Sequence, residues 1–372
     1  MTLKTGRIGG VVAVLALLLA GPAAAAELRV GFIPVIGAAQ LFVIEGEGWD
    51  RQAGIEVVPT QFESGPAMIS ALASGTLDAY YGGIGPLMVA QTRGIDVRVV
   101  AASAVGEMAV VARGALAGAG GDVVAALRAF ADREGRPARI ASQPPGSVPD
   151  TVLRYWLAKV VKADPATYEV VGMGIEQTQQ ALLAGAVDAA SIREPTLTLV
   201  LERDPGVRLL AVGNQMMPDQ PGSVLGLTGD FIRRDPEAAA KLVALHVRAT
   251  DFLNQHPDAA ARHLQKGLGK GIVPVDVYRR ALASPASSFV ADPGRIRAAT
   301  GVMQDFQLGL GVLKTPADLD RLFDGSFYLT ARTTGPEWGP KMTGPESGPK
   351  TGPESGPKIT GPEPGPGAGS AK

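Results

Sequence analysis

The stretch that decides the fold is ALLAGAVDAASIREP, Ala181 to Pro195, because an earlier stretch, ALASGTLDAYYGGIGP from Ala71 to Pro86, reads the same way. The recurring residues, all at an offset of 110, are Ala71, Leu72, Gly75, Asp78 and Ala79, which return as Ala181, Leu182, Gly185, Asp188 and Ala189. Each copy predicts a helix end, a glycine suited to a left-handed cap, a short strand, a loop, and a proline that opens the next helix. Two interpretations stay open: two related lobes, or the chance recurrence of a junction that is common in α/β proteins.

The first 26 residues have the pattern of a secretory signal peptide. Lys4 and Arg7 precede the apolar run Val11–Ala20, which is too short to span a bilayer, and three alanines at 24–26 offer a cleavage site. No cysteine follows the run, so no thiol is present for lipid attachment. We expect cleavage before Glu27 and a mature periplasmic protein that is not a lipoprotein; an uncleaved anchor is the alternative.

Composition excludes several functional classes. The 372 residues, of which 46% are hydrophobic and 19% charged, suffice for about two globular domains. A formal charge of −1 gives no electrostatic case for binding nucleic acid or an anionic membrane. The absence of cysteine excludes disulfides, thiolate zinc sites and a cysteine nucleophile.

Known catalytic and metal-binding motifs are also missing. The three histidines, His246, His256 and His263, do not form an i, i+4 metal pair, and no G-x-S-x-G, Walker lysine loop or H-E-x-x-H occurs. We therefore expect no metal, no cofactor and no enzymatic activity. Catalysis by paired carboxylates stays open, although no spacing argues for it.

Short apolar runs alternate with helical stretches from residue 27 to about 212. Runs such as Leu28–Ile33 and Val97–Ala102 predict strands, and segments such as Ala38–Trp49 and Ser147–Val161 predict helices. This alternation predicts an α/β fold in which a mostly parallel sheet carries helices on both faces. After residue 222 helices dominate.

The economical arrangement is two lobes joined by two crossings of the chain. We expect the chain to leave the first lobe near Ala104 to Gly106, to build the second, and to return near Asn214 to Ser223. The predicted organisation is a signal peptide at 1–26, the first part of lobe 1 at 27–105, lobe 2 at 106–214, the completion of lobe 1 with C-terminal helices at 215–332, and a tail at 333–372. The two crossings would act as a hinge.

The predicted tail repeats TGPEWGPK, TGPESGPK, TGPESGPK and TGPEPGP from Thr334 onward. A segment with so few apolar residues cannot recover its ordering entropy, so we expect it to be disordered and extended. It is either a solvated spacer or a segment that docks to a partner through Trp338.

Three strand-to-helix loops carry small residues that leave backbone N–H groups open at a helix start. They are Glu63-Ser64-Gly65-Pro66, Gly82-Gly83-Ile84-Gly85-Pro86 and Pro144-Pro145-Gly146-Ser147. A helix N-terminus has free donors and a partial positive charge, which suit an anion or a polar head group. In open parallel sheets such loops line the crevice in which ligands bind.

Four motifs follow the signal-peptide pattern in a fixed order: LRVGFIPVIGAAQLFVIEGEGW, ESGPAMISALASGTLDAYYGGIGP, PPGSVPDTVLRYWL and ALLAGAVDAASIREP. Over residues 27 to about 330 the chain resembles the periplasmic solute-binding proteins of nitrate/sulfonate/taurine-type ABC importers, a group that includes NMT1-like thiamine-precursor receptors. The resemblance implies a type II-like two-lobed periplasmic-binding-protein fold that closes on a small molecule. Its implied partners are a permease and ATPase complex in the inner membrane, and we expect a monomer.

The resemblance also implies a ligand-binding set. By position these residues are Pro34, Ile36, Gln40, Ser64, Gly65, Gly83, Gly85, Gly146, Ser147, Arg193 and Glu194. The first loop is apolar and Glu194 adds negative charge, so a ligand with a cationic or hydrogen-bonding group and an apolar body fits as well as an oxyanion. A solvated ion pair at a helix start is the alternative interpretation of Arg193 and Glu194.

The predicted function is a soluble periplasmic receptor that delivers a small organic molecule or an oxyanion of the nitrate/sulfonate/taurine type to a permease. An enzyme on this fold would need a catalytic histidine or nucleophile in a crevice loop, and the three loops have neither. Two alternatives remain: a receptor for a thiamine precursor or another apolar or cationic molecule, and a periplasmic sensor or scaffold.

Overall fold

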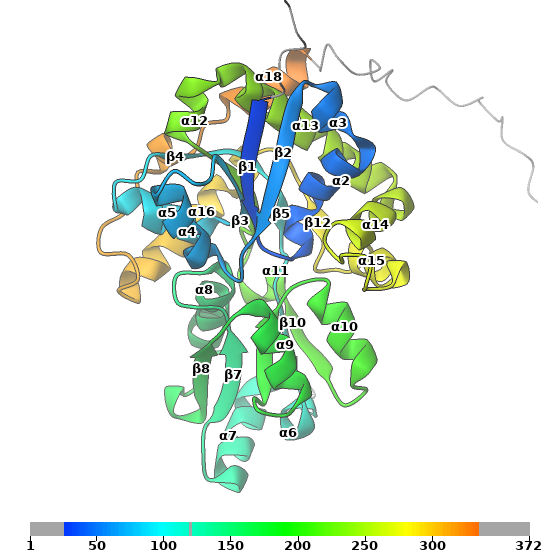
Figure 1. The fold of residues 1–372 in the computed structure, drawn as a ribbon. Helices are drawn as coiled ribbons and strands as arrows, with labels where there is room; N and C mark the ends of the chain where they lie inside the picture. The colour runs from blue at the N-terminus through cyan, green and yellow to red at the C-terminus, as the bar shows by residue number, and fades with distance from the viewer. Residues whose placement is uncertain (1–25, 119–120, 335–372) are drawn as a thin grey trace, which may run out of the picture. The chain divides into compact units, whose positions relative to one another are not determined.

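The computed structural model describes residues 26–118 and 121–334, which form two five-stranded sheets flanked by helices (Figure 1). The first sheet contains β1 (Ala26–Phe32), β2 (Ile55–Gln61), β3 (Ala79–Gly83), β4 (Val97–Ala102) and β11 (Ser223–Thr228). The second contains β6 (Ala109–Ala112), β7 (Ala138–Ser142), β8 (Tyr168–Gly172), β9 (Ala189–Ile192) and β10 (Arg208–Val212). A third, two-stranded sheet pairs β5 (Ala104–Val105) with β12 (Ser288–Phe289).

Each large sheet and its helices are called a lobe here. Lobe 1 carries a 3₁₀ turn (Ile36–Ala38), α2 (Ala39–Glu47), α3 (Trp49–Gln52), α4 (Gly65–Ala73), α5 (Ile84–Thr92), α12 (Gly229–Arg234), α13 (Pro236–Gln255), α14 (Pro257–Lys266), α15 (Val275–Leu282), α16 (Gly294–Gly309), α17 (Leu319–Leu322) and α18 (Ser326–Thr334). Lobe 2 carries α6 (Gly114–Ala117), α7 (Val123–Glu134), α8 (Val148–Tyr155), a π-helical turn (Trp156–Val160), a 3₁₀ turn (Pro165–Thr167), α9 (Ile175–Leu183), α10 (Thr196–Arg203) and α11 (Gly213–Met216).

Some predicted segments fall outside these elements. The predicted signal peptide lies outside the described residues except for Ala26, which begins β1. Two residues of the predicted tail, Thr333 and Thr334, are helical and close α18, and the remaining residues, 335–372, with Trp338, lie outside the described part of the chain.

The two large sheets have the same strand order. In the first, β2-β1-β3-β11-β4, the strand β11 runs antiparallel to both neighbours, while β1, β2 and β3 are parallel. In the second, β8-β7-β9-β6-β10, the strand β6 is antiparallel to both neighbours. Four strands of each sheet therefore share one direction, and the predicted α/β class with mostly parallel, helix-covered sheets is confirmed.

The sequence repeat occupies equivalent junctions in the two lobes. Gly75 follows α4 with φ of 71°, and Gly185 follows α9 with φ of 73°. Both glycine amides donate at 3.1 Å to a leucine carbonyl three residues earlier, Leu72 and Leu182. Since only glycine adopts this left-handed conformation without steric cost, both helices end by the same device.

The aspartates of the repeat also make equivalent contacts. The Asp78 amide donates to the Arg29 carbonyl at 2.9 Å, and the Asp188 amide donates to the Arg139 carbonyl at 2.8 Å. Each aspartate carboxylate in turn accepts a bond from the backbone amide of its arginine. Arg29 and Arg139, on β1 and β7, are themselves 110 residues apart, so the offset extends beyond the predicted repeat. This shared geometry favours two related lobes over chance similarity.

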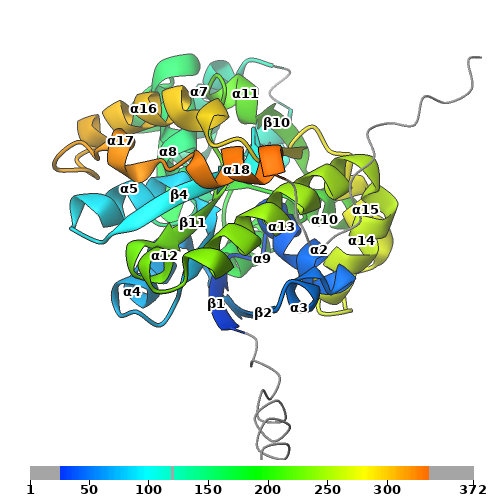
Figure 2. The ribbon, with the colours of Figure 1, turned by 90° about the horizontal axis from the view of Figure 1, so that it is seen from above.

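Apolar cores cover both faces of the first sheet. The sheet lies between a group of helices that includes α2, α13 and α14 and a group that includes α4, α5 and α16 (Figure 2). Tyr80 and Tyr81, adjacent on β3, are fully buried and contribute to different clusters, because successive strand residues point to opposite faces. The cluster that contains Tyr80 continues into lobe 2 through Val148 and Val152, so the lobes share apolar contacts.

The chain crosses twice between the lobes, and the two crossings lie against each other. The first passes from β4 through β5 to β6, and the second from β10 through α11 to β11. The Gly106 amide donates to the Gln220 carbonyl at 3.0 Å, and the Met108 amide donates to the Gln220 side chain at 3.2 Å. These bonds tie together the two segments that would act as a hinge.

A buried histidine in lobe 1 links α13 to the first sheet. His246 is fully buried, with one ring nitrogen 2.9 Å from the Tyr81 hydroxyl and the other 2.6 Å from the Ala102 carbonyl oxygen. Burial lowers the pKa of His246 to about 4. The folded protein therefore holds this imidazole neutral at a pH at which an exposed histidine is charged.

We expect His246 to make stability fall as the pH falls from about 6.5 to about 4. Over that window the unfolded chain binds a proton that the folded chain does not, so the loss is at most about 3 kcal/mol. Urea unfolding of the wild type and of His246→Gln at several pH values measures the slope, which is expected to be smaller in the variant. His256→Gln, at an exposed histidine, is the control and should leave the slope unchanged. Equal slopes in wild type and His246→Gln would contradict the assignment.

Candidate functional site

Loops at the ends of the sheets meet where lobe 1 faces lobe 2. The Ile36 amide donates to the Glu194 carbonyl at 2.9 Å across this boundary. A Cβ atom on Gly83 would lie 2.6 Å from the Val148 side chain, and one on Gly85 would lie 2.8 Å from the carbonyl oxygen of Gly146. The glycines of these predicted ligand loops therefore contact the opposite lobe directly.

A buried ion pair connects the lobes beside these loops. The Arg193 guanidinium, in the loop between β9 and α10, donates to a Glu107 carboxylate oxygen at 3.0 Å, and the two side chains are 1% and 0% exposed. The same oxygen accepts a bond from the Ser223 hydroxyl at 2.8 Å, and Ser223 begins β11. Glu107 lies between β5 and β6, so one carboxylate holds lobe 2, lobe 1 and the first crossing together.

The ion pair between Arg193 and Glu107 does not use all of its hydrogen-bonding atoms. Arg193 Nε, Glu107 Oε2 and Ser142 Oγ are buried and have no partner in the described part of the chain. Buried polar atoms are nearly always paired, and an orphaned group costs about 1–3 kcal/mol. A donor and an acceptor left open in one ion pair indicate a place where a ligand can complete the bonding.

Two neighbouring cavities lie along this boundary. The inner one, about 10 Å³, holds at most a single water. It is lined by Val35, Gln143, Ile175, Thr178, Ser191, Ile192, Arg193 and Thr196. The outer one measures about 410 Å³ and is lined by Glu63, Ser64, Pro144, Gly174, Glu176, Gln177 and Gln180. Gln143 and Pro144 are consecutive, as are Gln177 and Thr178, so the same two stretches of chain line both cavities; we call them together the cleft.

The predicted ligand residues take different positions relative to the cleft. Arg193 lines the inner cavity and Ser64 the outer one. Ile36 belongs to the core of lobe 1, although its amide reaches Glu194, and Pro34 is half-buried beside the cleft residue Val35. Gly65 packs against the side chains of Pro86 and Tyr80 rather than opening onto the cleft.

Gln40, another predicted ligand residue, belongs to a buried hydrogen-bond network in lobe 1 and does not line the cleft. Its side chain is fully buried and donates to the Ser103 carbonyl at 2.9 Å and to the Thr250 hydroxyl at 3.2 Å. The Ser103 hydroxyl in turn donates to the Gly37 carbonyl at 2.6 Å. This network fixes Gly37, where a Cβ atom would lie 2.2 Å from Ser223 Oγ and so leaves no room for a side chain.

The interpretation of Arg193 and Glu194 as a solvated ion pair is wrong. Both residues are buried, and Arg193 pairs with Glu107 instead. The Glu194 carboxylate accepts from the Thr198 amide at 3.0 Å and from its hydroxyl at 3.1 Å. Burial raises the pKa of Glu194. Arg193 and Glu194, although adjacent in the chain, therefore bond to different partners.

The helix starts also differ from the sequence-based expectation, because their side chains already occupy the donors. Ser64 Oγ accepts from the Ala67 amide at 3.3 Å at the start of α4, and Ser147 Oγ accepts from the Asp150 amide at 3.3 Å at the start of α8. These are N-cap bonds of the usual kind. They reduce the number of free amides that an anion could use.

We expect Ser147→Ala to lower stability by about 1 kcal/mol, because the variant loses the N-cap of α8. Urea unfolding measures this loss, and Ser147→Gly, which caps a helix almost as well as serine, should cost only a few tenths of that. An unchanged midpoint in Ser147→Ala would contradict the capping role. Whether Ser147 also binds ligand stays a prediction.

Sequence reasoning missed several residues of the cleft. Among the missed lining residues are Glu63, Gln143, Glu176 and Gln177. Glu107 and Ser223, which bond to one another beside Arg193, and Ser142, which has a buried hydroxyl without a partner in the described part of the chain, were missed as well. Glu107 carries a usable signal, since it is the one charged residue between Arg98 and Arg113, within an apolar stretch at the predicted crossing. The others have no signal of their own, because their position depends on which loops the two lobes bring together.

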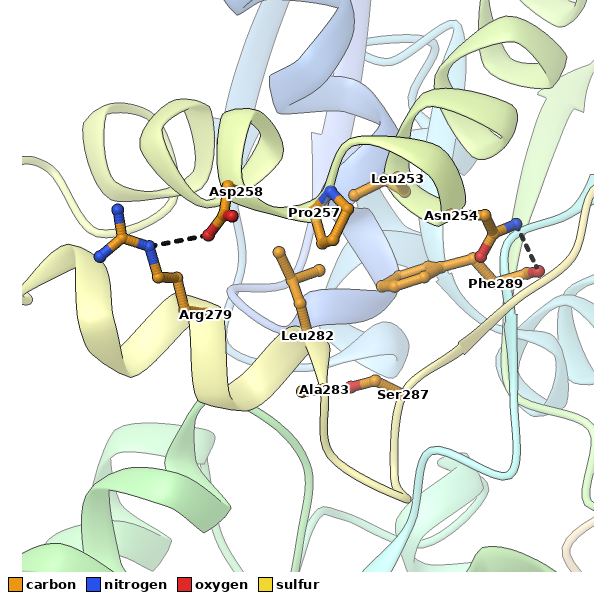
Figure 3. Close-up of a pocket in the computed structure, with 9 residues that line it drawn as sticks. All are labelled: Leu253, Asn254, Pro257, Asp258, Arg279, Leu282, Ala283, Ser287 and Phe289. Carbon is orange, nitrogen blue, oxygen red and sulfur yellow. Dashed lines mark hydrogen bonds and ion pairs between the residues drawn. The ribbon is translucent and has the colours of Figure 1, made fainter. Parts of the chain in front are cut away.

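A third cavity, about 330 Å³, lies within lobe 1 between α13, α14, α15 and β12 (Figure 3). Its charged side chains are paired with each other, since Arg279 donates to Asp258 at 3.0 Å, and the neutral Asn254 amide donates to the Phe289 carbonyl at 3.5 Å (Figure 3). None of its lining residues has a buried polar atom without a partner. This cavity therefore lacks the open bonding capacity of the cleft.

Two related α/β lobes that face each other across a polar cleft define the class of two-lobed periplasmic-binding-protein folds. Residues 21–266 match the model of the NMT1-like family, and the chain belongs to that family. Helices in the described ranges are all too short or too polar to cross a membrane. Within the same ranges, no three His, Cys, Asp or Glu side chains are grouped as a metal site requires.

Curated relatives cover most of the chain. A protein named as a binding protein in Brucella abortus (strain 2308) is 25% identical over 301 residues, which are 78% of this chain and 88% of the relative. A protein named as an aliphatic sulfonates-binding protein in Bacillus subtilis (strain 168) is 26% identical over 312 residues, or 82% of this chain and 88% of the relative.

Solved structures share the fold. The periplasmic nitrate-binding protein of Synechocystis PCC 6803 matches with a TM-score of 0.71 and 17% identity, over 83% of this chain and 88% of that one. The alkanesulfonate-binding protein of Xanthomonas axonopodis pv. citri, bound to MOPS, matches with a TM-score of 0.66 and 21% identity, over 81% and 99%.

Proposed function

We propose that this protein is the extracytoplasmic receptor of an ABC importer, which captures a small molecule in the cleft and presents it to a membrane permease. The observation that carries the proposal is the Arg193–Glu107 pair, which joins the lobes and leaves Arg193 Nε and Glu107 Oε2 without partners. Membership of the NMT1-like family supports it, as do relatives named as binding proteins. The signal-peptide pattern supports a periplasmic location.

Closure follows from the position of the cleft. A ligand that contacts Ser64 of lobe 1 and Arg193 or Gln143 of lobe 2 binds the closed form more tightly than the open form. Its differential affinity then shifts the population toward closure. The Gly106–Gln220 bond between the crossings is the position about which the lobes would rotate.

The chemistry of the cleft supports binding without turnover. None of the three histidines lines either cavity of the cleft, and its hydroxyl groups, on Ser64, Thr178, Ser191 and Thr196, have no histidine beside them to act as base. The protein would therefore release its ligand unchanged.

A thermal-shift screen of the ligand-stripped, refolded protein against a library of small metabolites tests the function. A ligand at about 100 times its dissociation constant adds about 2.7 kcal/mol of stability and should also reduce the radius of gyration measured by X-ray scattering. Hits are then added to the reconstituted permease and ATPase complex, where the loaded receptor should raise the rate of ATP hydrolysis. Chemical conversion of a hit during incubation, or binding without compaction, would contradict the receptor role.

A further inference from the structure

The cleft has an excess of negative charge. The charged side chains that line its two cavities are Arg193, Glu63 and Glu176. Arg193 is already neutralised by Glu107 at 3.0 Å, and both side chains are buried. Neither Glu63 nor Glu176 forms an ion pair with another residue in the described ranges. The outer cavity therefore presents two uncompensated carboxylates, one from each lobe.

Three helix starts near the lobe boundary already have an amide bonded to a side chain of the protein. The start of α4 is capped by Ser64, and the start of α8 by Ser147. At the start of α10 the Glu194 carboxylate accepts from the Thr198 amide. An anion at these three helix starts would have to displace these bonds, and an anion in the outer cavity would be repelled by Glu63 and Glu176.

A group at the inner end of the cleft adds a second, independent indication of a ligand. The Arg193 side chain is 1% exposed, lines the inner cavity, and keeps Nε without a partner in the described part of the chain. A lone donor needs an acceptor atom, such as a carbonyl or hydroxyl oxygen or a ring nitrogen. The guanidinium cannot supply this donor to a bare cation, so the ligand needs an acceptor as well.

We propose that the cleft binds an organic cation that also carries a hydrogen-bond acceptor. The cationic group lies between Glu63 and Glu176 in the outer cavity, and the acceptor end points toward the inner cavity, where a single water can link it to Arg193. The volume of about 410 Å³ suits a small molecule. This inference rests on the proposed receptor function. It assigns this cleft a ligand of opposite charge to the nitrate and sulfonates named for the relatives.

Isothermal titration of the full exported protein with choline, glycinamide and acetylcholine, which are cations that each carry an acceptor oxygen, tests the ligand class, with nitrate and ethanesulfonate as the anionic set. We expect at least one of the three cations to bind and neither anion to do so. Binding of the cation should weaken as salt is added, because part of the attraction is screened.

Charge-removing variants test the position of the cation. Glu63→Gln and Glu176→Gln are each expected to weaken cation binding about fivefold, because each removes one attractive charge at an exposed site in the outer cavity. Glu56→Gln on β2 and Glu169→Gln on β8 remove exposed carboxylates of the same lobes outside the cleft, and they are expected to leave the affinity unchanged. Thermal unfolding without ligand shows that each variant is folded.

The outcomes distinguish a wrong ligand class from a wrong receptor function. Failure of all three cations to bind overturns the ligand class, as does an anion that binds and gains affinity in Glu63→Gln. In either case the receptor function stands if the metabolite screen still gives a compacting ligand. Equal weakening by Glu56→Gln and Glu63→Gln overturns the placement of the cation in the cleft.

Discussion

Arg193→Ala should destabilise the protein by about 3–5 kcal/mol, the largest effect that we expect from a single side-chain truncation at the cleft. The variant leaves the Glu107 carboxylate buried without its cation, and charge removed from water is costly unless it is paired. Ser223 would still donate one hydrogen bond to Glu107, but a neutral hydroxyl compensates only part of the charge. Urea unfolding at neutral pH measures the loss.

The double variant Arg193→Met with Glu107→Leu separates the buried charge from the interaction. Replacing both partners by apolar residues removes the orphaned charge, so we expect most of the stability lost in Arg193→Ala to return. Ligand binding should not return with it, because the open donor at Arg193 Nε is gone. The difference in stability between Arg193→Ala and the double variant therefore measures the cost of the unpaired buried charge. Loss of ligand binding in the double variant, despite its recovered stability, shows that Arg193 belongs to the binding site.

The pair Arg280–Glu202 is a matched control, since it also joins α15 of lobe 1 to α10 of lobe 2 but is exposed. Arg280→Ala should cost less than about 1 kcal/mol, because an exposed ion pair is solvated in either state. If Arg193→Ala costs no more than Arg280→Ala, Arg193 and Glu107 are not a buried pair.

Local signals predicted the lobes well, because each junction is built from residues close together in the chain. Gly75 and Gly185 end helices by a conformation that glycine alone adopts easily, and Asp78 and Asp188 follow at a fixed distance. These features act within a few residues, so a sequence pattern can report them. The alternation of strands and helices is local in the same way.

The cleft could be predicted only in part, because its contacts join distant residues. The sequence allows Arg193 and Glu194 to be either ligand residues or a solvated ion pair with each other, yet the Arg193 guanidinium pairs with Glu107, 86 residues away. A buried arginine and a solvated one look identical in sequence. Likewise Ser64 and Ser147 read equally well as open anion sites and as N-caps, and only the observed bonds to Ala67 and Asp150 decide between them.

Gly213→Ala is expected to destabilise the protein by about 3 kcal/mol and to alter closure, because Gly213 lies where the two crossings touch. A Cβ atom at this position would be 2.4 Å from the carbonyl oxygen of Gly106 and 2.6 Å from its Cα atom. Both are backbone atoms, which cannot rotate away as a flexible side chain does. Gly106 is further held by its bond to Gln220 and by its φ of 62°. The added methyl group must therefore push the crossings apart.

Separation of the crossings changes the geometry about which the lobes rotate, so Gly213→Ala should show a different radius of gyration without ligand as well as a lower melting temperature. Gly309→Ala, in the last turn of α16, is the control, because a Cβ atom there meets nothing within 4 Å. That variant is expected to be neutral or slightly more stable, by up to about 1 kcal/mol, since alanine favours the helix. If Gly213→Ala matches Gly309→Ala in both measurements, the crossings are not in contact and closure does not depend on them. If Gly213→Ala lowers the melting temperature but leaves the radius of gyration unchanged, the contact between the crossings serves stability alone. If the variant changes both the melting temperature and the radius of gyration, the paired crossings act as the hinge between the lobes.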